Sequence, residues 1–170
     1  MAALSTTTWQ IQTASAEQTR HLGAALGRCL RGGDFVALDG DLGAGKTTLC
    51  AGVGDGLQVD APLRSPSYLL CHEAEGRHPV LHLDAYFEQR LDGLLAEGLV
   101  ERFDGGTVVL VEWAERLRAW LPEERLAVRL LTTADPQAEE QRDIRFEAHG
   151  ARAEALLAEL REAWKTAQDV

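Results

Sequence analysis

The stretch of the sequence best suited to chemistry is rich in glycine and ends in a lysine and two threonines. It satisfies the pattern G-x-x-x-x-G-K-[ST], and with the threonine that follows it consists of Gly40, Asp41, Leu42, Gly43, Ala44, Gly45, Lys46, Thr47 and Thr48. Because glycines lack a Cβ, successive backbone N–H groups of such a loop can converge on phosphate oxygens at the N-terminus of a following helix. The sequence therefore predicts a phosphate-binding loop.

Three side chains of this loop have separate expected tasks. Lys46 can reach the β- and γ-phosphates of a nucleotide, and the hydroxyl of Thr47 can ligate Mg²⁺. Thr48 is placed to contact the α-phosphate. Of the seventeen basic residues only Lys46 and Lys165 are lysines. We therefore expect replacement of Lys46 to impair nucleotide binding more than replacement of any other cation.

Two acidic residues directly follow apolar runs and are candidates for holding the metal or its water. Glu112 follows the run 107–111, and Asp84 follows the run 80–83. Carboxylates at the C-terminal ends of parallel strands line the crevice in which α/β sheets bind ligands. The alternative for each residue is that it is merely the first polar residue after a strand and lies in solvent. We expect both acids to be functional and to hold the metal or its water.

The composition narrows the choice of nucleotide. The sequence contains no asparagine, which excludes the Asn-Lys-x-Asp stretch by which Ras-like GTPases recognise guanine. ATP is therefore expected, with slow hydrolysis if the chain itself supplies no arginine finger. Two alternatives stay open: a P-loop kinase of a small metabolite, although the candidate lid 91–103 holds only Arg102 as a basic residue, and a nucleotide-dependent adaptor without significant hydrolysis.

These residues need strands and helices to position them. Apolar runs and alternation predict strands at 8–12, 35–38, 68–72, 80–83, 107–111, 127–132 and 142–148. Helices are expected after a capping box of Ser15 and Gln18, at 47–56, in a glycine-interrupted stretch at 91–103, and from 151 onward. This alternation predicts an α/β fold, a P-loop NTPase-like three-layer sandwich whose mixed sheet has a parallel core and antiparallel edge strands.

Length and charge limit the classes of function. The 170 residues suggest one P-loop ATPase domain covering 1–170. A net charge of −10 argues against direct nucleic-acid binding. No apolar run is long enough for a membrane span and no leader is evident, so we expect no membrane contact and a cytoplasmic protein. The chain has three cysteines, Cys29, Cys50 and Cys71. We expect all three to be small buried hydrophobic residues.

With these motifs assembled, the chain resembles the TsaE (YjeE) family, the small ATPases of the bacterial tRNA threonylcarbamoyladenosine pathway. The resemblance runs from about residue 15 to about residue 150. It rests on the strand and loop 35–48, on Ser65-Pro66-Ser67-Tyr68, on His82-Leu83-Asp84-Ala85-Tyr86 and on Val111-Glu112-Trp113.

The resemblance implies roles for single residues. Thr47 and Glu112 would hold Mg²⁺, while Asp84 and Trp113 would matter for turnover. Thr19 looks like a family threonine that borders the adenine. The implied partners are TsaB and TsaD, which transfer the threonylcarbamoyl group to adenosine in tRNA.

A few residues near these motifs carry further expectations. The family usually has arginine where this chain has Phe87, and threonine where it has Ser67. His82 is expected to be a packed strand histidine that orients Asp84. Trp113 should point to the face opposite Glu112 if the strand continues. Arg142 is placed to reach the same pocket as Thr19.

Overall fold

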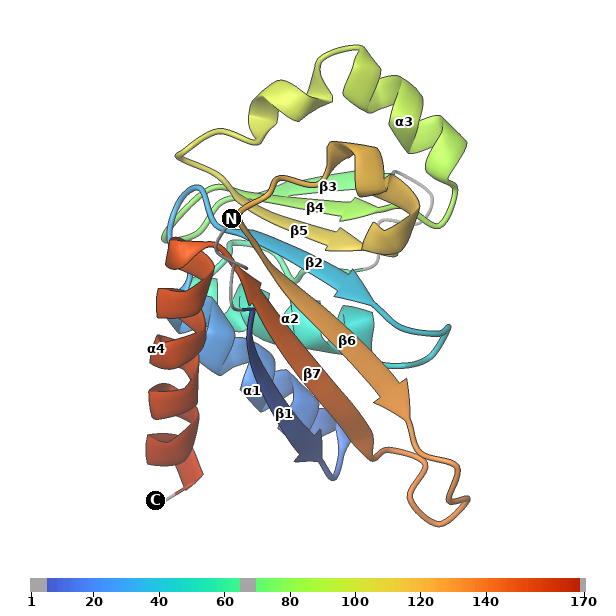
Figure 1. Cartoon of the computed structure of the whole chain (residues 1–170), viewed down its shortest axis with the longest axis vertical. Helices are drawn as coiled ribbons and strands as arrows, with labels where there is room; N and C mark the ends of the chain where they lie inside the picture. The colour runs from blue at the N-terminus through green and yellow to red at the C-terminus, as the bar shows by residue number, and fades with distance from the viewer. Residues whose placement is uncertain (1–5, 65–69, 169–170) are drawn as a thin grey trace.

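The computed structural model describes residues 6–64 and 70–168, and seven strands of this part form one sheet (Figure 1). The strand order is β1-β7-β6-β2-β5-β4-β3. β2 runs parallel to β5 and β6, and β4 runs parallel to β5, whereas the pairs β1·β7, β6·β7 and β3·β4 are antiparallel. The strands are β1 (Thr7–Thr13), β2 (Phe35–Asp39), β3 (Cys71–Ala74), β4 (Val80–Asp84), β5 (Val108–Glu112), β6 (Arg125–Thr132) and β7 (Arg142–His149). The predicted parallel core with antiparallel edges is confirmed, and the antiparallel strands lie at both edges.

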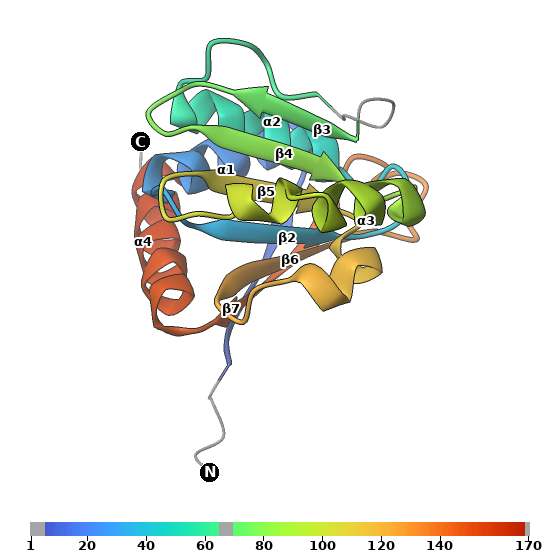
Figure 2. The same cartoon turned by 90° about the horizontal axis from the view of Figure 1, so that it is seen from above.

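Helices cover both faces of this sheet (Figures 1 and 2). One face carries α1 (Ala16–Cys29), α2 (Lys46–Leu57) and α4 (Ala151–Gln168). The other carries α3 (Glu88–Ala96) and two 3-10 helices, η1 (Leu99–Arg102) and η2 (Ala114–Trp120). Side chains alternate along β2, so Val36 and Leu38 pack with the first group of helices and Phe35 and Ala37 with the second. The three-layer prediction is confirmed.

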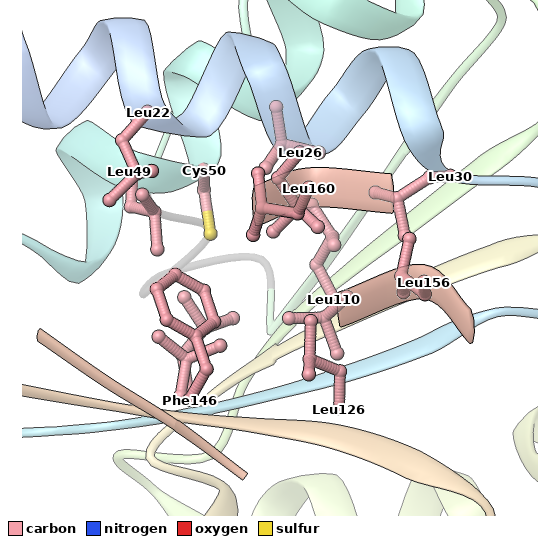
Figure 3. Packing of buried hydrophobic residues seen from close by; sticks show 14 of the residues in the cluster. Leu22, Leu26, Leu30, Leu49, Cys50, Leu110, Leu126, Phe146, Leu156 and Leu160 are labelled. Atoms are coloured by element: carbon pink, nitrogen blue, oxygen red, sulfur yellow. The ribbon is translucent and has the colours of Figure 1, made fainter. Parts of the chain in front are cut away.

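The larger core lies between the sheet and the helices α1, α2 and α4. Figure 3 shows Leu22 and Leu26 of α1 and Leu160 of α4 converging above Phe146 of the sheet. Each of these four side chains is fully buried, which contributes about 1.5–3 kcal/mol per side chain relative to exposure in water. Helix α4 thus docks through the apolar stripe that its sequence predicts.

The first helix begins at the predicted cap, with one difference. The hydroxyl of Ser15 accepts a hydrogen bond from the Gln18 amide at 3.1 Å. The Gln18 side chain returns to the amide of Ala14, at 2.6 Å, and not to that of Ser15. The helix ends at Cys29, shortly before Gly32 and Gly33, and Gly33 adopts a φ of +94°.

Helices α1 and α2 pack almost backbone against backbone through glycines. A Cβ added at Gly23 of α1 would lie 2.2 Å from the carbonyl oxygen of Leu49, and one added at Gly52 of α2 would lie 2.0 Å from that of Arg20. Both distances are far below van der Waals contact. The glycines therefore fix how closely α2, whose N-terminus follows the glycine-rich loop, approaches α1.

Some elements differ from the prediction. The strand expected at 68–72 begins, in the described residues, at Cys71, and 65–69 lie outside the described part. The helical stretch 91–103 consists of most of α3 and η1, separated at Gly98, whose φ is +120°. Helix η2 was not predicted.

The cysteines and the hydropathy of the helices give two further outcomes. Cys50 is buried as predicted, but Cys29 and Cys71 are only partly buried, so for these two the prediction is wrong. Both sit at ends of elements, where neighbours enclose them less completely. Within the described ranges, no helix combines the length and the apolar character needed to cross a membrane.

Candidate functional site

The glycine-rich loop connects the end of β2 to the start of α2, as its pattern requires. Gly45 is the N-cap of α2 and has a φ of +100°, a left-handed conformation that glycine adopts without strain. Gly40 is required for a different reason, because a Cβ there would lie 2.5 Å from the carbonyl oxygen of Leu130 on β6. The predicted strand, loop and helix are confirmed.

The first turn of α2 presents backbone donors to this loop. The first backbone hydrogen bond of the helix runs from the Leu49 amide to the Gly45 carbonyl, at 2.9 Å. The amides of Lys46, Thr47 and Thr48 precede it and have no intrahelical acceptor. These amides and the positive end of the helix dipole form an anion-binding cradle.

A cavity of about 550 Å³ opens beside the cradle. This volume lies within the range typical of ligand pockets. Its lining combines loop residues with residues from the ends of β4 and β5, and consists of Leu42, Gly43, Gly45, Lys46, Thr47, Thr48, Asp84, Tyr86, Phe87, Glu112 and Trp113. The structure thus brings nine of the thirteen predicted site residues to this cavity, and Gly40, Asp41, Ala44 and Thr19 are outside its lining.

Lys46 is held inside the loop and is only 5% exposed. Its Nζ donates to the carbonyl oxygens of Gly40 and Asp41, the second at 2.9 Å, and lies 4.0 Å from the centroid of the Trp113 ring. Burial lowers the pKa of Lys46, and the nearby carboxylates, Glu112 foremost, oppose that shift. The cation is therefore poorly solvated, so an anion in the cradle would gain a strong partner.

Two carboxylates face this lysine from adjacent strand ends. The parallel register of β4 and β5 sets Asp84 opposite Glu112, and the two residues are 3% and 2% exposed. Asp84 Oδ1 accepts a hydrogen bond from the Tyr86 amide at 2.9 Å. The alternative that these acids lie in solvent is wrong, because neighbouring strands and the loop cover both.

Thr47 and Glu112 already contact each other across the site. The Thr47 hydroxyl lies 3.2 Å from Oε1 and 3.1 Å from Oε2 of Glu112. A hydroxyl and a carboxylate are the hard oxygen ligands that Mg²⁺ prefers, and Mg²⁺ usually keeps several waters, for which the cavity has room. The residues present therefore fit the ion that the sequence predicts.

Softer metal ligands lie on the other side of Glu112. Cys50 Sγ, a ring nitrogen of His82 and a carboxylate oxygen of Glu112 are within 4.8 Å of one another, and all three residues are buried. A metal-bound histidine normally donates its second ring N–H to an acceptor, but the buried Nδ1 of His82 has no hydrogen-bond partner within residues 6–64 and 70–168. Burial also raises the pKa of the Cys50 thiol well above its usual value. These features favour a hydrogen-bonded cluster over a zinc site.

His82 differs from its prediction. Its Nε2 lies 2.9 Å from Oε1 of Glu112, and its Nδ1 has no hydrogen-bond partner in the described part of the chain, so the expectation that His82 orients Asp84 is wrong. The reason is the parallel pairing of β4 with β5. It places the histidine beside the neighbouring strand, from which the Glu112 side chain reaches it.

Trp113 also differs from its prediction. Its φ of +58° is left-handed, so β5 ends at Glu112 and the expected alternation stops. The ring consequently lines the same cavity as Glu112 and does not point away from it. The guanidinium of Arg116, which the sequence did not single out, lies 5.0 Å from the Trp113 ring and 4.9 Å from the Tyr86 ring.

Thr19 and Arg142 lie next to the loop without lining the cavity. Thr19 is only 1% exposed, and its hydroxyl shares a hydrogen bond of 2.7 Å with the Thr13 hydroxyl. The Thr19 hydroxyl is therefore not presented to a ligand. Arg142 donates to the carbonyl oxygens of Ala44 and Gly43, at 2.9 and 3.1 Å. Through these hydrogen bonds Arg142, which lies on β7, holds the loop in place. No local sequence pattern predicts this role.

Comparison with known proteins agrees with this geometry. The model of the family described as "Threonylcarbamoyl adenosine biosynthesis protein TsaE" matches residues 13–144. The chain belongs to the TsaE family. This family takes part in the biosynthesis of tRNA threonylcarbamoyladenosine. The resemblance that the sequence motifs indicated is thereby confirmed.

Relatives in the TsaE family match over most of their length. The TsaE protein of Bacillus subtilis is 36% identical over 151 residues, which is 88% of this chain and 91% of that protein. The TsaE protein of Streptomyces coelicolor is 40% identical over 141 residues, or 78% and 92% of the two chains. A crystal structure of Bacillus subtilis YdiB is similar with a TM-score of 0.80 and 32% identity, covering 94% of this chain and 98% of that one.

Proposed function

We propose that this chain is a Mg²⁺-dependent ATPase that hydrolyses ATP slowly and acts on a TsaB–TsaD complex during formation of the threonylcarbamoyl group on adenosine of tRNA. The observation that carries the proposal is the contact of Thr47 with Glu112 at the opening of a phosphate-binding loop. Membership of the TsaE family supplies the pathway.

In this proposal the chain binds, positions and shields the nucleotide. The amides and glycines of the loop Gly40–Thr48 bind the phosphates, and Lys46 adds the positive charge. Thr47 and Glu112 hold Mg²⁺, which when bound neutralises charge on the phosphate oxygens. Asp84 orients a water, and the Trp113 ring covers Lys46.

Slow hydrolysis follows from the scarcity of cations. Among the described residues that line the cavity, Lys46 is the only basic one. Arg116 packs against the aromatic rings of the rim, where it donates to the Tyr86 carbonyl oxygen. Arg102, which a kinase lid would need, pairs with Glu73 at 2.7 Å. Arginine fingers accelerate phosphoryl transfer by orders of magnitude, so their absence from this lining favours a low intrinsic rate.

The exposed apolar residues at the rim of the cavity support the proposal that a protein partner binds there. Leu42, Tyr86 and Phe87 are 82%, 39% and 49% exposed around the opening. An apolar rim of this kind is typical of a surface that a partner covers. Phe87 stands where the family usually has arginine, so on this chain the contact would be apolar at that position.

Substitution of Glu112 tests the proposal. Phosphate release and ATP binding by calorimetry should be measured for the wild-type chain and for Glu112→Ala, with Mg²⁺ and with EDTA. We expect the variant to keep binding ATP in EDTA and to lose Mg²⁺-dependent hydrolysis by about 100-fold or more, since the metal supplies several kcal/mol to the transition state. Equal hydrolysis by both proteins would overturn the proposal.

The same assays separate the two alternatives. Phosphate that appears on an added metabolite and not in solution would indicate a kinase. Binding without turnover, even in single-turnover measurements with TsaB and TsaD present, would indicate an adaptor. Association with the TsaB–TsaD pair should depend on the nucleotide and on Lys46. If the chain associates equally in ATP and in ADP, and if Lys46→Ala associates as the wild type does, the nucleotide-dependent role on that complex is removed.

A further inference from the structure

The carboxylate of Glu112 is enclosed by three side chains of this chain. The Thr47 hydroxyl lies on the cavity side. The imidazole of His82, which is fully buried, contacts Oε1 through Nε2 at 2.9 Å. The thiol of Cys50, which Figure 3 shows pointing from α2 toward the sheet, completes the cluster. The mechanism described above uses Thr47 and Glu112 and leaves His82 and Cys50 without a task.

The hydrogen-bonding chemistry fixes how His82 must act. An ionised carboxylate only accepts hydrogen bonds, so Nε2–H of His82 is the donor of this hydrogen bond and Oε1 is the acceptor. Nδ1 has no hydrogen-bond partner among the described residues, so the contact of Nε2 with Oε1 is the hydrogen bond that ties the imidazole to the site. A buried carboxylate is costly without donors. His82 supplies a strong one from the side opposite the cavity.

We propose that His82 is a positioning residue that holds Oε1 of Glu112 and thereby fixes the carboxylate orientation in which Glu112, together with Thr47, receives Mg²⁺. This inference rests on the proposed metal-binding function. Hydrogen bonds from a second layer of residues orient metal-binding side chains, and their loss typically costs 10- to 100-fold in metal affinity or activity. The neighbouring thiol of Cys50, a weak donor, has the smaller effect.

A pair of matched substitutions separates this role from simple packing. Glutamine places its amide nitrogen the same number of bonds from Cβ as Nε2 of histidine, so His82→Gln keeps the donor toward Glu112. In His82→Met the side chain has nearly the same length and volume as the glutamine of His82→Gln, but it has no hydrogen-bond donor. If His82 only fills space, the two variants should behave alike. Thermal unfolding followed by circular dichroism shows whether each variant folds.

The test measures metal binding directly, in addition to hydrolysis. Binding of Mn²⁺, a spectroscopic substitute for Mg²⁺, is titrated by electron paramagnetic resonance in the presence of ATP, and ATP binding in EDTA is measured by calorimetry. We expect His82→Met to bind ATP in EDTA like the wild type and to weaken Mn²⁺ binding about 10- to 100-fold. His82→Gln should stay within about threefold of the wild type.

Each other outcome contradicts a separate claim. Equal Mn²⁺ affinity in the wild type and His82→Met would overturn the positioning role, as would equal losses in His82→Gln and His82→Met. Loss of ATP binding in EDTA by His82→Met, to the same degree as its loss of Mn²⁺ binding, would assign His82 to the structure of the loop instead. If the wild type itself shows no ATP-dependent Mn²⁺ binding, the proposed function fails, independently of His82.

Discussion

At the scale of residues, the two lysines offer a matched comparison. Lys46 is buried in the loop, whereas Lys165 lies on α4, where it pairs with Glu162 at 3.0 Å and its side chain is 64% exposed. Hydrogen bonds to charged groups contribute about 1.5–3 kcal/mol. We therefore predict that Lys46→Ala weakens ATP binding by about 10- to 100-fold and that Lys165→Ala leaves it unchanged, as measured by calorimetry. A similar loss in both variants would show that net charge, and not the loop, governs affinity.

The site residues divide into those that the sequence could predict and those that it could not. The loop is contiguous, and Asp84 and Glu112 each follow an apolar strand, so local patterns suffice to identify them. The partner of His82 depends on which strand lies beside β4, and the brace from Arg142 joins residues about a hundred positions apart. The direction of the Trp113 side chain depends on the left-handed φ of this residue, which no neighbouring residue type predicts.

At the scale of elements, the glycine contact between α1 and α2 can be tested against another helical glycine. Gly23→Ala would place a Cβ 2.2 Å from the Leu49 carbonyl oxygen, so the helices must separate. Gly93, in α3, has nothing within 4 Å of an added Cβ. We predict that Gly23→Ala lowers the free energy of unfolding by about 1–3 kcal/mol, and that Gly93→Ala raises it by up to about 1 kcal/mol. Urea unfolding measures both, and a neutral Gly23→Ala would contradict the close packing.

The same two helices are joined at their surface by an ion pair. Arg20 donates to both carboxylate oxygens of Asp55, at 2.6 and 3.0 Å, and this lowers the pKa of Asp55. A depressed pKa in the folded state means that the pair stabilises the fold above the unfolded pKa of Asp55, near 3.8, and that this stabilisation is lost as pH falls through the folded value. Both side chains are about half exposed, so solvent screens the interaction.

This pair gives a pH-dependent prediction. At neutral pH, Asp55→Asn should lower the free energy of unfolding by less than about 1 kcal/mol. The difference from the wild type should shrink as the pH falls below 3.8 and through the lowered pKa of Asp55, because protonation removes the charge that pairs with Arg20. Urea unfolding of the two proteins at neutral pH and at a series of acidic pH values checks this, and a difference that does not change with pH would show that the ion pair contributes nothing.

Elements were predictable where their pattern is local. The valine-rich β5 and the apolar stripe of α4 depend on residues within the element itself. Helix η2 follows the left-handed turn at Trp113 and buries only Ala114 and Leu117, so its sequence carries little periodicity. Likewise, a glycine normally lowers the stability of a helix. Only the position of the partner helix shows that Gly23 and Gly52 are needed for packing.

At the scale of the whole molecule, the question is whether the chain itself holds the tRNA of its pathway. Its net charge is −10. The register of β6 and β7 sets Arg129 and Arg145 opposite each other, which alone would attract phosphates. Arg129 lies 3.7 Å from Glu115, however, and Arg145 lies 3.3 Å from Glu147. The local positive charge is therefore largely compensated.

We predict that the chain alone binds tRNA no more tightly than about 10⁻⁴ M at physiological salt, the weak limit of non-specific binding. Fluorescence anisotropy of labelled tRNA measures this affinity, with polylysine as the positive control in the same buffer. Binding through phosphates releases counterions, so its strength falls steeply with salt. Saturable micromolar binding that weakens strongly as salt rises would contradict the prediction, and Arg129→Gln and Arg145→Gln would then show whether these arginines form the contact.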